Sequence, residues 1–189
     1  MSVSVHHVMV KRDNALTNVD SVENSNVLSR WYAAYTLPRH EKAVAGRLVK
    51  EEIETYLPLY WAVRHWNHRL VNVELPLFPG YVFIRMMITD KVRVLKHPGV
   101  IRLVGFNGKA AALPDGEIEM LRSTLAIYRA QPYPYLTAGK KIRIRSGPFM
   151  GLEGRILRRK GKMRVVASID LIQRSFLLEL DGAEAYLAS

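Results

Sequence analysis

The chain has 189 residues, no cysteine, and a formal net charge of +11 from 28 basic and 17 acidic residues. Without cysteine it can form neither disulfides nor thiolate metal sites. We find no secretory apolar region near the N-terminus and no run of about 18 apolar residues, the length that a membrane-spanning helix needs. With 49% hydrophobic residues, the sequence predicts a cytoplasmic protein of one or two domains that contacts no membrane.

The positive charge is distributed unevenly along the chain. Residues 1–29 carry 2 basic and 3 acidic groups, residues 30–136 carry 15 and 9, and residues 137–189 carry 11 and 5. A basic surface attracts phosphate backbones because binding releases their counterions. The charge therefore favours a role close to nucleic acid over the alternative that Lys and Arg only solubilise the surface.

Residues 30–130 begin with the strand and helix patterns of an α+β domain. They follow residues 1–29, whose Ser- and Asn-rich composition predicts a flexible tail. The segment "RWYAAYTLP" predicts an aromatic strand. A helix is expected from Pro38, with an apolar stripe of Val44, Ala45, Leu48 and Val49.

The remainder of this first domain continues the mixture of strand and helix patterns. Two extended runs, "TYLPLYWAVRHW" and "LVNVELPLFPGYVFIRMM", are followed by a short helix that Pro98-Gly99 ends. The segment "VIRLVGF" predicts a strand, and "NGKAAALPDG" predicts a loop. Asp115 can cap a last helix whose Ile118, Leu121, Leu125 and Tyr128 share one face. We therefore expect an antiparallel sheet with flanking helices.

The last third of the chain predicts a second domain. The segment "AQPYPYL" favours extended geometry, and we assign residues 131–137 to a linker. In residues 138–189, "KKIRIR" alternates apolar and basic residues, and "RILRRKGKMRVVASI" predicts a hairpin that turns at Lys160-Gly161. Several short strands in about 50 residues predict a small, basic, all-β barrel.

No group of residues in the sequence predicts catalysis. The acids at Glu117 and Glu119 fall in a first helical turn, where they complement the helix dipole. His65 and His68 have ligand-like spacing but no third ligand nearby. The segment "GFNGKA" lacks the first glycine and the hydroxyl of a phosphate-binding loop. We expect no enzyme, no cofactor and no metal.

The strand in "PLFPGYVFIRMM" is apolar on both faces. Its alternation places Tyr81, Phe83 and Arg85 on one face and Val82, Ile84 and Met86 on the other. In an α+β domain one sheet face packs against helices and the other can stay open. Either Phe78, Tyr81 and Phe83 form an exposed apolar patch that contacts another protein, or they belong to the core.

Taken in order along the chain, these segments resemble the NusG family of transcription elongation factors. The segments "WYAAYTLPRHEKAVAGRL", "YLPLY", "PLFPGYVFI" and "PGVIRLVGF" fall where the family's NGN domain has them, and "GKKIRIRSGPFMGLEGRI" resembles its KOW domain. The resemblance covers residues 30–189. It implies an α+β NGN domain at residues 30–130 and an SH3-like KOW barrel at residues 138–189.

The resemblance also implies a partner and a function. Members of the family bind the clamp region of RNA polymerase through the NGN domain and favour processive elongation, and we expect a monomer without a cofactor. By motif position, the implied polymerase contacts are Trp31, Tyr32, Phe78, Tyr81, Phe83 and Arg85. The residues implied to lie near upstream or non-template DNA are Arg39, His40, Lys42, Lys96 and His97.

The KOW segment departs from NusG itself, whose barrel contacts termination factor Rho or ribosomal protein S-ten through a loop with an exposed Phe. Here "SIDLIQRS" replaces that Phe with Asp170-Leu171-Ile172. This argues against Rho, leaves S-ten as a partner to consider, and lets Leu171 and Ile172 either serve another partner or plug the barrel. The candidate KOW contacts are Phe149, Arg158, Arg159, Lys160, Leu171 and Ile172.

The segments "PLFPGYVF", "GLEGRILRRKGK" and "SIDLIQRS" together are closer to specialised paralogues of the UpxY and RfaH sort. Those proteins are antiterminators of particular operons, so the resemblance predicts an operon-specific antitermination factor. Two alternatives stay open. One is a general NusG-like factor that couples polymerase to Rho or the ribosome, and the other is a ribosome-associated or RNA-binding KOW protein without a polymerase role.

Overall fold

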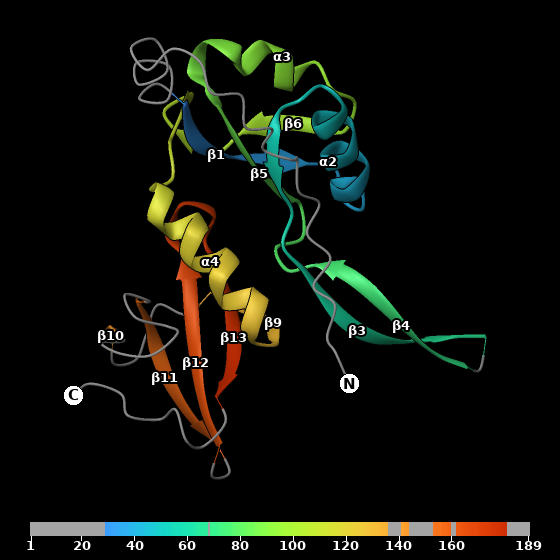
Figure 1. The fold of residues 1–189 in the computed structure, drawn as a ribbon, viewed down its shortest axis with the longest axis vertical. Helices are drawn as coiled ribbons and strands as arrows, with labels where there is room; N and C mark the ends of the chain where they lie inside the picture. The colour runs from blue at the N-terminus through green and yellow to red at the C-terminus, as the bar shows by residue number, and fades with distance from the viewer. Residues whose placement is uncertain (1–28, 68, 136–140, 144–152, 160–161, 181–189) are drawn as a thin grey trace, which may run out of the picture. The chain divides into compact units, whose positions relative to one another are not determined.

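The computed structural model describes residues 29–67, 69–135, 141–143, 153–159 and 162–180 (Figure 1). Contacts between Cα atoms divide the chain into two compact units. Unit 1 comprises Met1–Leu57 and Pro79–Asp115, and unit 2 comprises Pro58–Phe78 and Gly116–Ser189. The division thus falls at the start of the helix predicted from Asp115, and the predicted boundaries at residues 130 and 138 stay a prediction.

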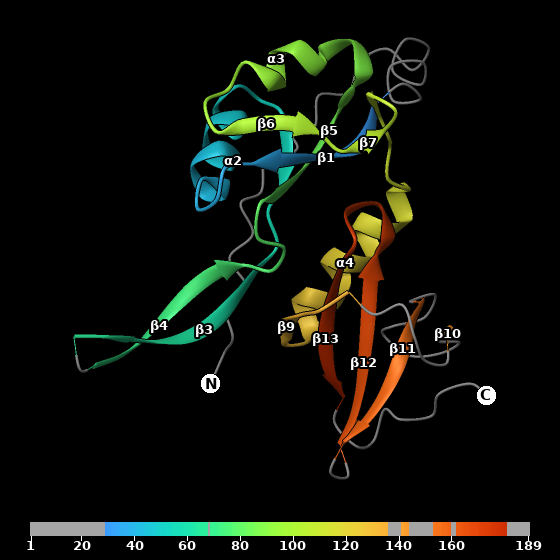
Figure 2. The ribbon, with the colours of Figure 1, turned by 180° about the vertical axis from the view of Figure 1, so that it is seen from behind.

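Unit 1 contains a four-stranded antiparallel sheet in the order β2-β5-β1-β6. Figures 1 and 2 show the helices α2 and α3 beside this sheet. The strands are β1 (Ser29–Thr36), β2 (Glu54–Tyr56), β5 (Tyr81–Met87) and β6 (Val100–Leu103), and the helices are α2 (Glu41–Lys50), η1 (Ile88–Asp90) and α3 (Lys91–Leu95). The predicted α+β arrangement of sheet and flanking helices is confirmed for these elements.

The core of unit 1 follows the predicted periodicity closely. Val44, Ala45 and Leu48 of α2 are buried, as their helical spacing predicts, whereas Val49 of the same predicted stripe is half-buried. In β5 the alternating residues Val82 and Ile84 are fully buried. Burying each such aliphatic side chain contributes about 1.5–3 kcal/mol, so the central strands stabilise the unit.

Two Pro-Gly turns hold the end of β1. The backbone amide of Thr36 donates to the carbonyl of Gly80 at 2.8 Å, and the next amide, that of Leu37, donates to the carbonyl of Gly99 at 2.8 Å. Both glycines have a left-handed backbone, with φ of 85° and 94°. A Cβ on Gly99 would lie 3.1 Å from Val44 Cγ2 and 3.2 Å from His40 Cβ, so this turn lies directly against the start of α2.

Side chains of α2 bind the same two turns. The carboxylate of Glu41, which is buried, accepts a hydrogen bond from the backbone amide of Gly80 at 2.7 Å. The guanidinium group of Arg47 donates to the carbonyl of Pro98. Hydrogen bonds to charged groups stabilise a fold more than neutral ones do. Helix α2 is therefore fixed to both turns and, through them, to β1.

Part of the predicted loop after β6 is ordered as a hairpin. Strands β7 (Gly105–Phe106) and β8 (Lys109–Ala110) pair antiparallel. Asn107 and Gly108 connect them with φ of 50° and 74°, the two positive values of a type I′ turn. The Asn-Gly dipeptide therefore makes a hairpin, where the sequence analysis expected only a loop.

Unit 2 contains a hairpin, a helix and a five-stranded antiparallel sheet. The hairpin pairs β3 (Leu59–Trp66) with β4 (Arg69–Pro76), and the helix is α4 (Asp115–Ile127). Ile118, Leu121 and Leu125 of α4 are buried, which confirms three of the four residues predicted for its apolar face. The sheet has the order β10-β11-β12-β13-β9, with strands β9 (Ala130–Tyr133), β10 (Lys141–Arg143), β11 (Glu153–Arg159), β12 (Lys162–Ile169) and β13 (Arg174–Leu180).

The sheet of unit 2 differs in two ways from the sequence prediction. Its described strands form an open sheet, because no pairing joins the outer strands β10 and β9. The segment predicted as a linker also contributes β9, which pairs with β13. Pro132 is compatible with this strand because β9 lies at the edge, where a missing amide donor leaves no partner unpaired.

One acidic side chain in unit 2 has an altered proton affinity. Glu117 lies in the first turn of α4, and burial, followed by the charge of Asp170, raises its pKa from 4.5 to about 7. Asp170 itself accepts a hydrogen bond from the hydroxyl of Tyr135 at 3.0 Å. The sequence analysis expected Glu117 only to complement the helix dipole. Its partial burial beside a second acid instead places its change of protonation near neutral pH.

We predict that Gly99→Ala lowers the free energy of unfolding by roughly 1–3 kcal/mol. The new Cβ would strain the left-handed backbone and press on Val44 and His40. Chemical denaturation measures the loss. Gly46→Ala is the matched control, because Gly46 lies in α2 with open space around its Cα, so the change should stabilise by about 0.5–1 kcal/mol. Equal effects at both positions would contradict the assigned packing.

We also predict that the protein loses stability as the pH rises from 4.5 towards 7. In this interval folded Glu117 keeps its proton while the unfolded chain releases it, because the folded pKa is the higher one. Glu117→Gln, which stays neutral, should flatten this slope and make the variant the more stable protein above about pH 7. Urea denaturation at about pH 5 and about pH 8 tests this, and an unchanged slope would show that Glu117 does not control it.

Candidate functional site

The register of the unit 1 sheet brings aromatic residues together on one face. Tyr35 of β1 lies opposite Tyr81 of β5 and Arg102 of β6, and Tyr56 of β2 lies opposite Phe83. Directly paired residues project to the same side of a sheet. We call this surface the tyrosine face; its residues are Trp31, Tyr35, Tyr56, Tyr81, Phe83, Arg85 and Arg102.

The rings of the tyrosine face contact one another across the strands. The Tyr35 and Tyr81 ring centroids lie 5.4 Å apart at an interplanar angle of 49°. The guanidinium carbon of Arg102 lies 5.4 Å from the Tyr35 ring centroid, within the range of a cation–π interaction. Tyr35 and Tyr81 are half-buried and Arg102 is exposed. This part of the face therefore presents both apolar and cationic surface to solvent.

Of the two alternatives for Phe83, an exposed patch or a place in the core, the core is the one observed. Phe83 does share a face with Tyr81 and Arg85, as the alternation predicts, but it is 0% exposed, as is Trp31. The Tyr56 ring stacks on Phe83 with centroids 6.3 Å apart, and its neighbour on β1 is the small Ala33, which leaves room for the ring. Phe83 and Trp31 thus form the packed base of the face.

Two other residues predicted for the polymerase contact lie elsewhere. Tyr32 projects to the opposite side of the sheet, since it pairs with Ile84, and it is 6% exposed. Phe78 precedes β5 and is 1% exposed. Its ring lies edge-on to that of Phe176 in unit 2, with centroids 5.8 Å apart. For these two residues the alternative that they belong to a core is the one observed.

Arg85 lies at the margin of the tyrosine face. Its guanidinium nitrogens lie 3.7 Å from a carboxylate oxygen of Glu54 and 3.8 Å from one of Asp115. The Arg85 side chain is 22% exposed. Two acidic neighbours hold the guanidinium group at a partly exposed position.

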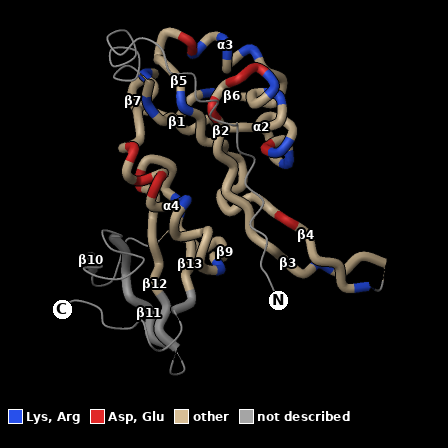
Figure 3. Tube along the Cα trace, viewed as in Figure 1, with Lys and Arg blue, Asp and Glu red and all other residues tan. Residues whose placement is uncertain are grey.

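The basic residues predicted to lie near DNA meet at one end of unit 1. The approach of Gly99 to His40 brings the start of α2 close to the turn that follows α3, and Figure 3 shows Lys and Arg along both helices. Arg39, His40 and Lys42 are exposed. These three side chains are therefore accessible to a charged partner.

The other two predicted residues, Lys96 and His97, lie close to an acid. The carboxylate oxygens of Glu51, the residue that follows α2, lie 3.9 Å from Lys96 Nζ, 3.4 Å from His97 Nε2 and 3.5 Å from Arg93 Nε. Lys96 is 61% exposed, but the His97 side chain is only 6% exposed. His97 thus packs between the helices and offers no surface for nucleic acid.

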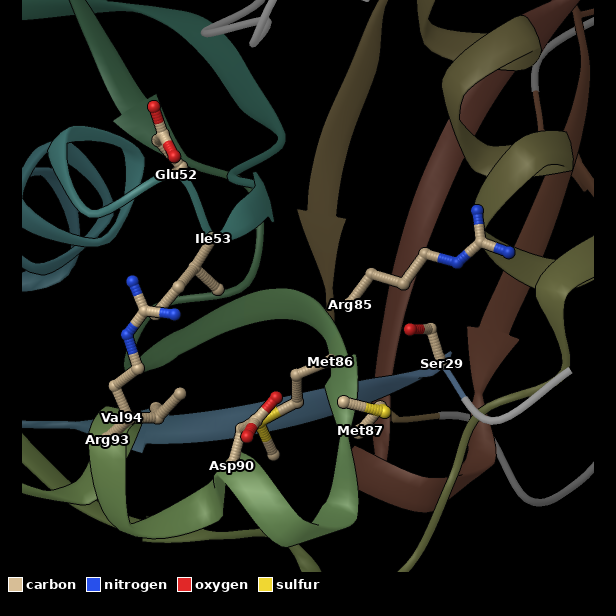
Figure 4. A pocket seen from close by; sticks show the side chains of 9 residues that line it. All are labelled: Ser29, Glu52, Ile53, Arg85, Met86, Met87, Asp90, Arg93 and Val94. Atoms are coloured by element: carbon tan, nitrogen blue, oxygen red, sulfur yellow. The ribbon is translucent and has the colours of Figure 1, made fainter. Parts of the chain in front are cut away.

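A small pocket lies on the other side of the sheet, between β5 and α3 (Figure 4). Its volume is about 160 Å³, and Met86, Ile53 and Val94 contribute apolar walls. The Arg93 side chain lies beside these apolar side chains, whereas the guanidinium group of Arg85 points away from them. Pockets for drug-sized ligands have about 300–1,000 Å³, so this one is too small to hold such a molecule.

The candidate KOW contacts are only partly described. Phe149 and Lys160 lie outside the described residues, and Arg158 and Arg159 lie on β11. Leu171 is half-buried in the short helix η2 (Asp170–Ile172), whereas Ile172 is 4% exposed. Of the two alternatives for Ile172, packing inside its own unit is the one observed.

The described part of the chain offers neither a cluster of metal ligands nor a membrane-spanning helix. There, no group of three or more His, Asp or Glu side chains could hold a metal ion. His68 lies outside the described residues. No described helix is long and apolar enough to cross a membrane.

Sequence reasoning missed Tyr56 and Arg102 as members of the tyrosine face. The signal for Tyr56 was present, because it stands in "TYLPLY" beside the predicted start of a strand. Arg102 could not be assigned, since its position opposite Tyr35 depends on the pairing of β6 with β1 and on the register shift at Tyr35 and Thr36.

Comparisons with known proteins agree with these features. A sequence model of the NusG family, described as "Transcription termination factor nusG", matches residues 29–122. The chain is 23% identical over 177 residues to the transcription termination/antitermination protein NusG of Rickettsia bellii, covering 86% of this chain and 93% of that protein. It is 28% identical over 179 residues to the NusG of Lactococcus lactis, covering 85% and 95%.

A solved structure gives the same result for the fold. The structure described as "Domain interaction in Thermotoga maritima NusG" has a TM-score of 0.53 and 21% sequence identity, and the match covers 82% of this chain and 95% of that one. The residues matched by the family model, 29–122, include the unit 1 sheet and its helices α2 and α3. The chain belongs to the NusG family of transcription termination and antitermination factors.

Proposed function

We propose that this protein is a transcription elongation factor that binds RNA polymerase through the tyrosine face and promotes antitermination. The observation that carries the proposal is the accessible group of Tyr35, Tyr81 and Arg102. Tyr and Arg are the residue types that contribute most to binding energy at protein interfaces. RNA polymerase is the proposed partner because the chain belongs to a family of transcription factors, and such factors act on the transcribing polymerase.

The proposal gives different roles to the residues of the tyrosine face. Tyr81 contacts the clamp region of the polymerase, and Arg85 lies at the rim of that contact. Phe83 and Trp31 are fully buried, so they support the contact by fixing the rings above them. Tyr32 and Phe78 have no direct role, because they lie away from this face.

The exposed basic residues extend the proposal to DNA. Arg39, His40 and Lys42 are proposed to lie near upstream or non-template DNA in the transcribing complex, with Lys96 as a weaker contributor because Glu51 binds it. His97 is left out, since its side chain is buried. Such contacts would hold the DNA by charge alone and would weaken as salt concentration rises.

We further propose an operon-specific role in the cytoplasm. The η2 segment places Ile172 in the interior, and Asp170 and Leu171 supply no aromatic ring at this turn. A contact that needs an exposed Phe there is therefore not supported, which disfavours Rho. We propose that Leu171 contacts another KOW partner such as ribosomal protein S-ten, and that Arg158 and Arg159 contribute charge to this contact, as their sequence positions predict. A general factor that couples polymerase to the ribosome remains the second candidate.

We predict that the full-length protein binds purified RNA polymerase and that Tyr81→Ala weakens this binding about tenfold or more, as loss of a central tyrosine does at other interfaces. Binding is measured by titration against labelled polymerase. Tyr133→Ala is the matched control, because Tyr133 is also a half-buried tyrosine but lies on β9 in unit 2. Urea denaturation should show that both variants stay folded.

A transcription assay across an intrinsic terminator completes the test. Wild-type protein should increase read-through and shorten pauses, and Tyr81→Ala should need a higher concentration for the same effect. An unchanged terminator and pause pattern with wild-type protein would overturn the proposed function. Equal polymerase binding by wild type and Tyr81→Ala would overturn the assigned face instead.

A further inference from the structure

The hairpin of β3 and β4 carries large hydrophobic side chains in an unusual setting. The two strands pair from Leu59 and Pro76 to Trp66 and Arg69, and none of the other described strands joins them (Figures 1 and 2). Trp66 is 72% exposed and Trp61 is 55% exposed. Exposed tryptophans are uncommon on a surface that serves only solubility, because burying such a ring is strongly favourable.

The pairing register separates the hairpin's side chains into two faces. Arg64 and Trp66 project to one side with their partners Val71 and Arg69. We call these four residues the tip face. Trp61 projects to the other side, opposite Glu74, the hairpin's acidic residue. The tip face therefore combines one indole ring and two guanidinium groups with no acid.

The charges of the tip face are available to a partner. Arg64 and Arg69 are both exposed, and in the part of the chain that the structure describes neither forms an ion pair. Directly opposite residues such as Trp66 and Arg69 have Cβ atoms about 4.5–5.5 Å apart. A cation thus lies beside the exposed ring on the neighbouring strand, and a second lies two residues away on the same strand.

This combination matches the chemistry of unpaired nucleic acid. Proteins hold single strands by stacking bases on aromatic rings and by placing cations along the phosphates. In a duplex the faces of the bases are already stacked, so an exposed indole selects unpaired ones. An acidic protein partner would satisfy the two arginines but would give Trp66 no stacking surface, and an apolar partner would leave both guanidinium groups without a counter-charge.

We propose that the tip face binds unpaired nucleic acid, with one base stacked on Trp66 and the flanking phosphates held by Arg64 and Arg69. The site is separate from the tyrosine face and does not depend on RNA polymerase. Stacking uses the face of a base, which DNA and RNA share. The strand it holds is therefore defined by being unpaired rather than by its sequence.

The test is fluorescence anisotropy of the full-length protein with a labelled oligothymidylate of about 12 nucleotides, a length within the usual site sizes. Trp66→Ala should weaken binding about tenfold, in the range measured for loss of one stacked base. Trp61→Ala is the matched control, since it removes an exposed tryptophan from the same hairpin but from the opposite face, and it should bind like wild type.

Two further measurements separate stacking from charge. In a Trp61→Phe background the oligonucleotide should quench tryptophan fluorescence, and Trp66→Phe should abolish that quenching while keeping part of the affinity. Arg64→Ala with Arg69→Ala should reduce the slope of log affinity against log salt by about 1.4, because each phosphate contact on a single strand contributes about 0.7. The control for charge is Lys109→Ala with Arg129→Ala, which removes two positive charges elsewhere on the protein. In this background the oligonucleotide should still quench tryptophan fluorescence, and Trp66→Ala should weaken binding by the same factor as in wild type.

The outcomes either support the proposal or overturn it. Tighter binding of oligothymidylate or of oligouridylate than of a duplex of equal length supports it, and the preferred oligonucleotide identifies which strand the site takes. Equal affinity for duplex and single strand overturns it. Wild-type binding by Trp66→Ala, or equal losses for Trp66→Ala and Trp61→Ala, also overturns it, and polymerase binding tested in parallel shows whether the tyrosine face is affected.

Discussion

Two consecutive backbone amides at the end of β1 organise unit 1. Thr36 and Leu37 donate to the carbonyls of Gly80 and Gly99, each at 2.8 Å. The two acceptors come from Pro-Gly turns that lie far apart in the sequence, and helix α2 binds both turns through Glu41 and Arg47. One strand end, one helix and two turns are thus fixed together by backbone geometry. Because left-handed φ angles are strained for other residues, this junction depends on glycine at both turns.

This junction also determines which face of the sheet can bind a partner. With α2 and α3 held on the side where Met86 and Val94 line one small pocket, the opposite side is left for Tyr35 and Tyr81. The junction supports that face directly, since a Cβ on Gly80 would lie 3.2 Å from the Tyr35 ring. Gly80 therefore lets its turn approach Tyr35 closely and also fixes the start of β5. Both the fold of unit 1 and the tyrosine face thus require glycine at this position.

Alternation and helical spacing predicted much of unit 1 and the apolar face of α4 in unit 2. They gave the two faces of β5, the buried stripe of α2 and three of the buried residues of α4. They could not predict that Phe83 is buried, because that depends on the Tyr56 ring from another strand. They also could not assign Pro132 to β9, since its pairing with Phe176 joins segments more than 40 residues apart. Strand pairing and register between distant segments determine these positions, and the local sequence pattern does not contain that information.

The tip face of the hairpin illustrates how a side chain that the fold requires differs from one that only binding explains. Trp31 is fully buried, and its burial stabilises unit 1, so folding alone explains a large apolar residue there. Trp66 is 72% exposed on a two-stranded ribbon, where a side chain gains little from burial and an isolated hairpin is marginally stable. Folding would accept a smaller polar residue at that position. The indole, with a guanidinium group opposite it and another beside it, is therefore better explained by what it binds than by what it stabilises.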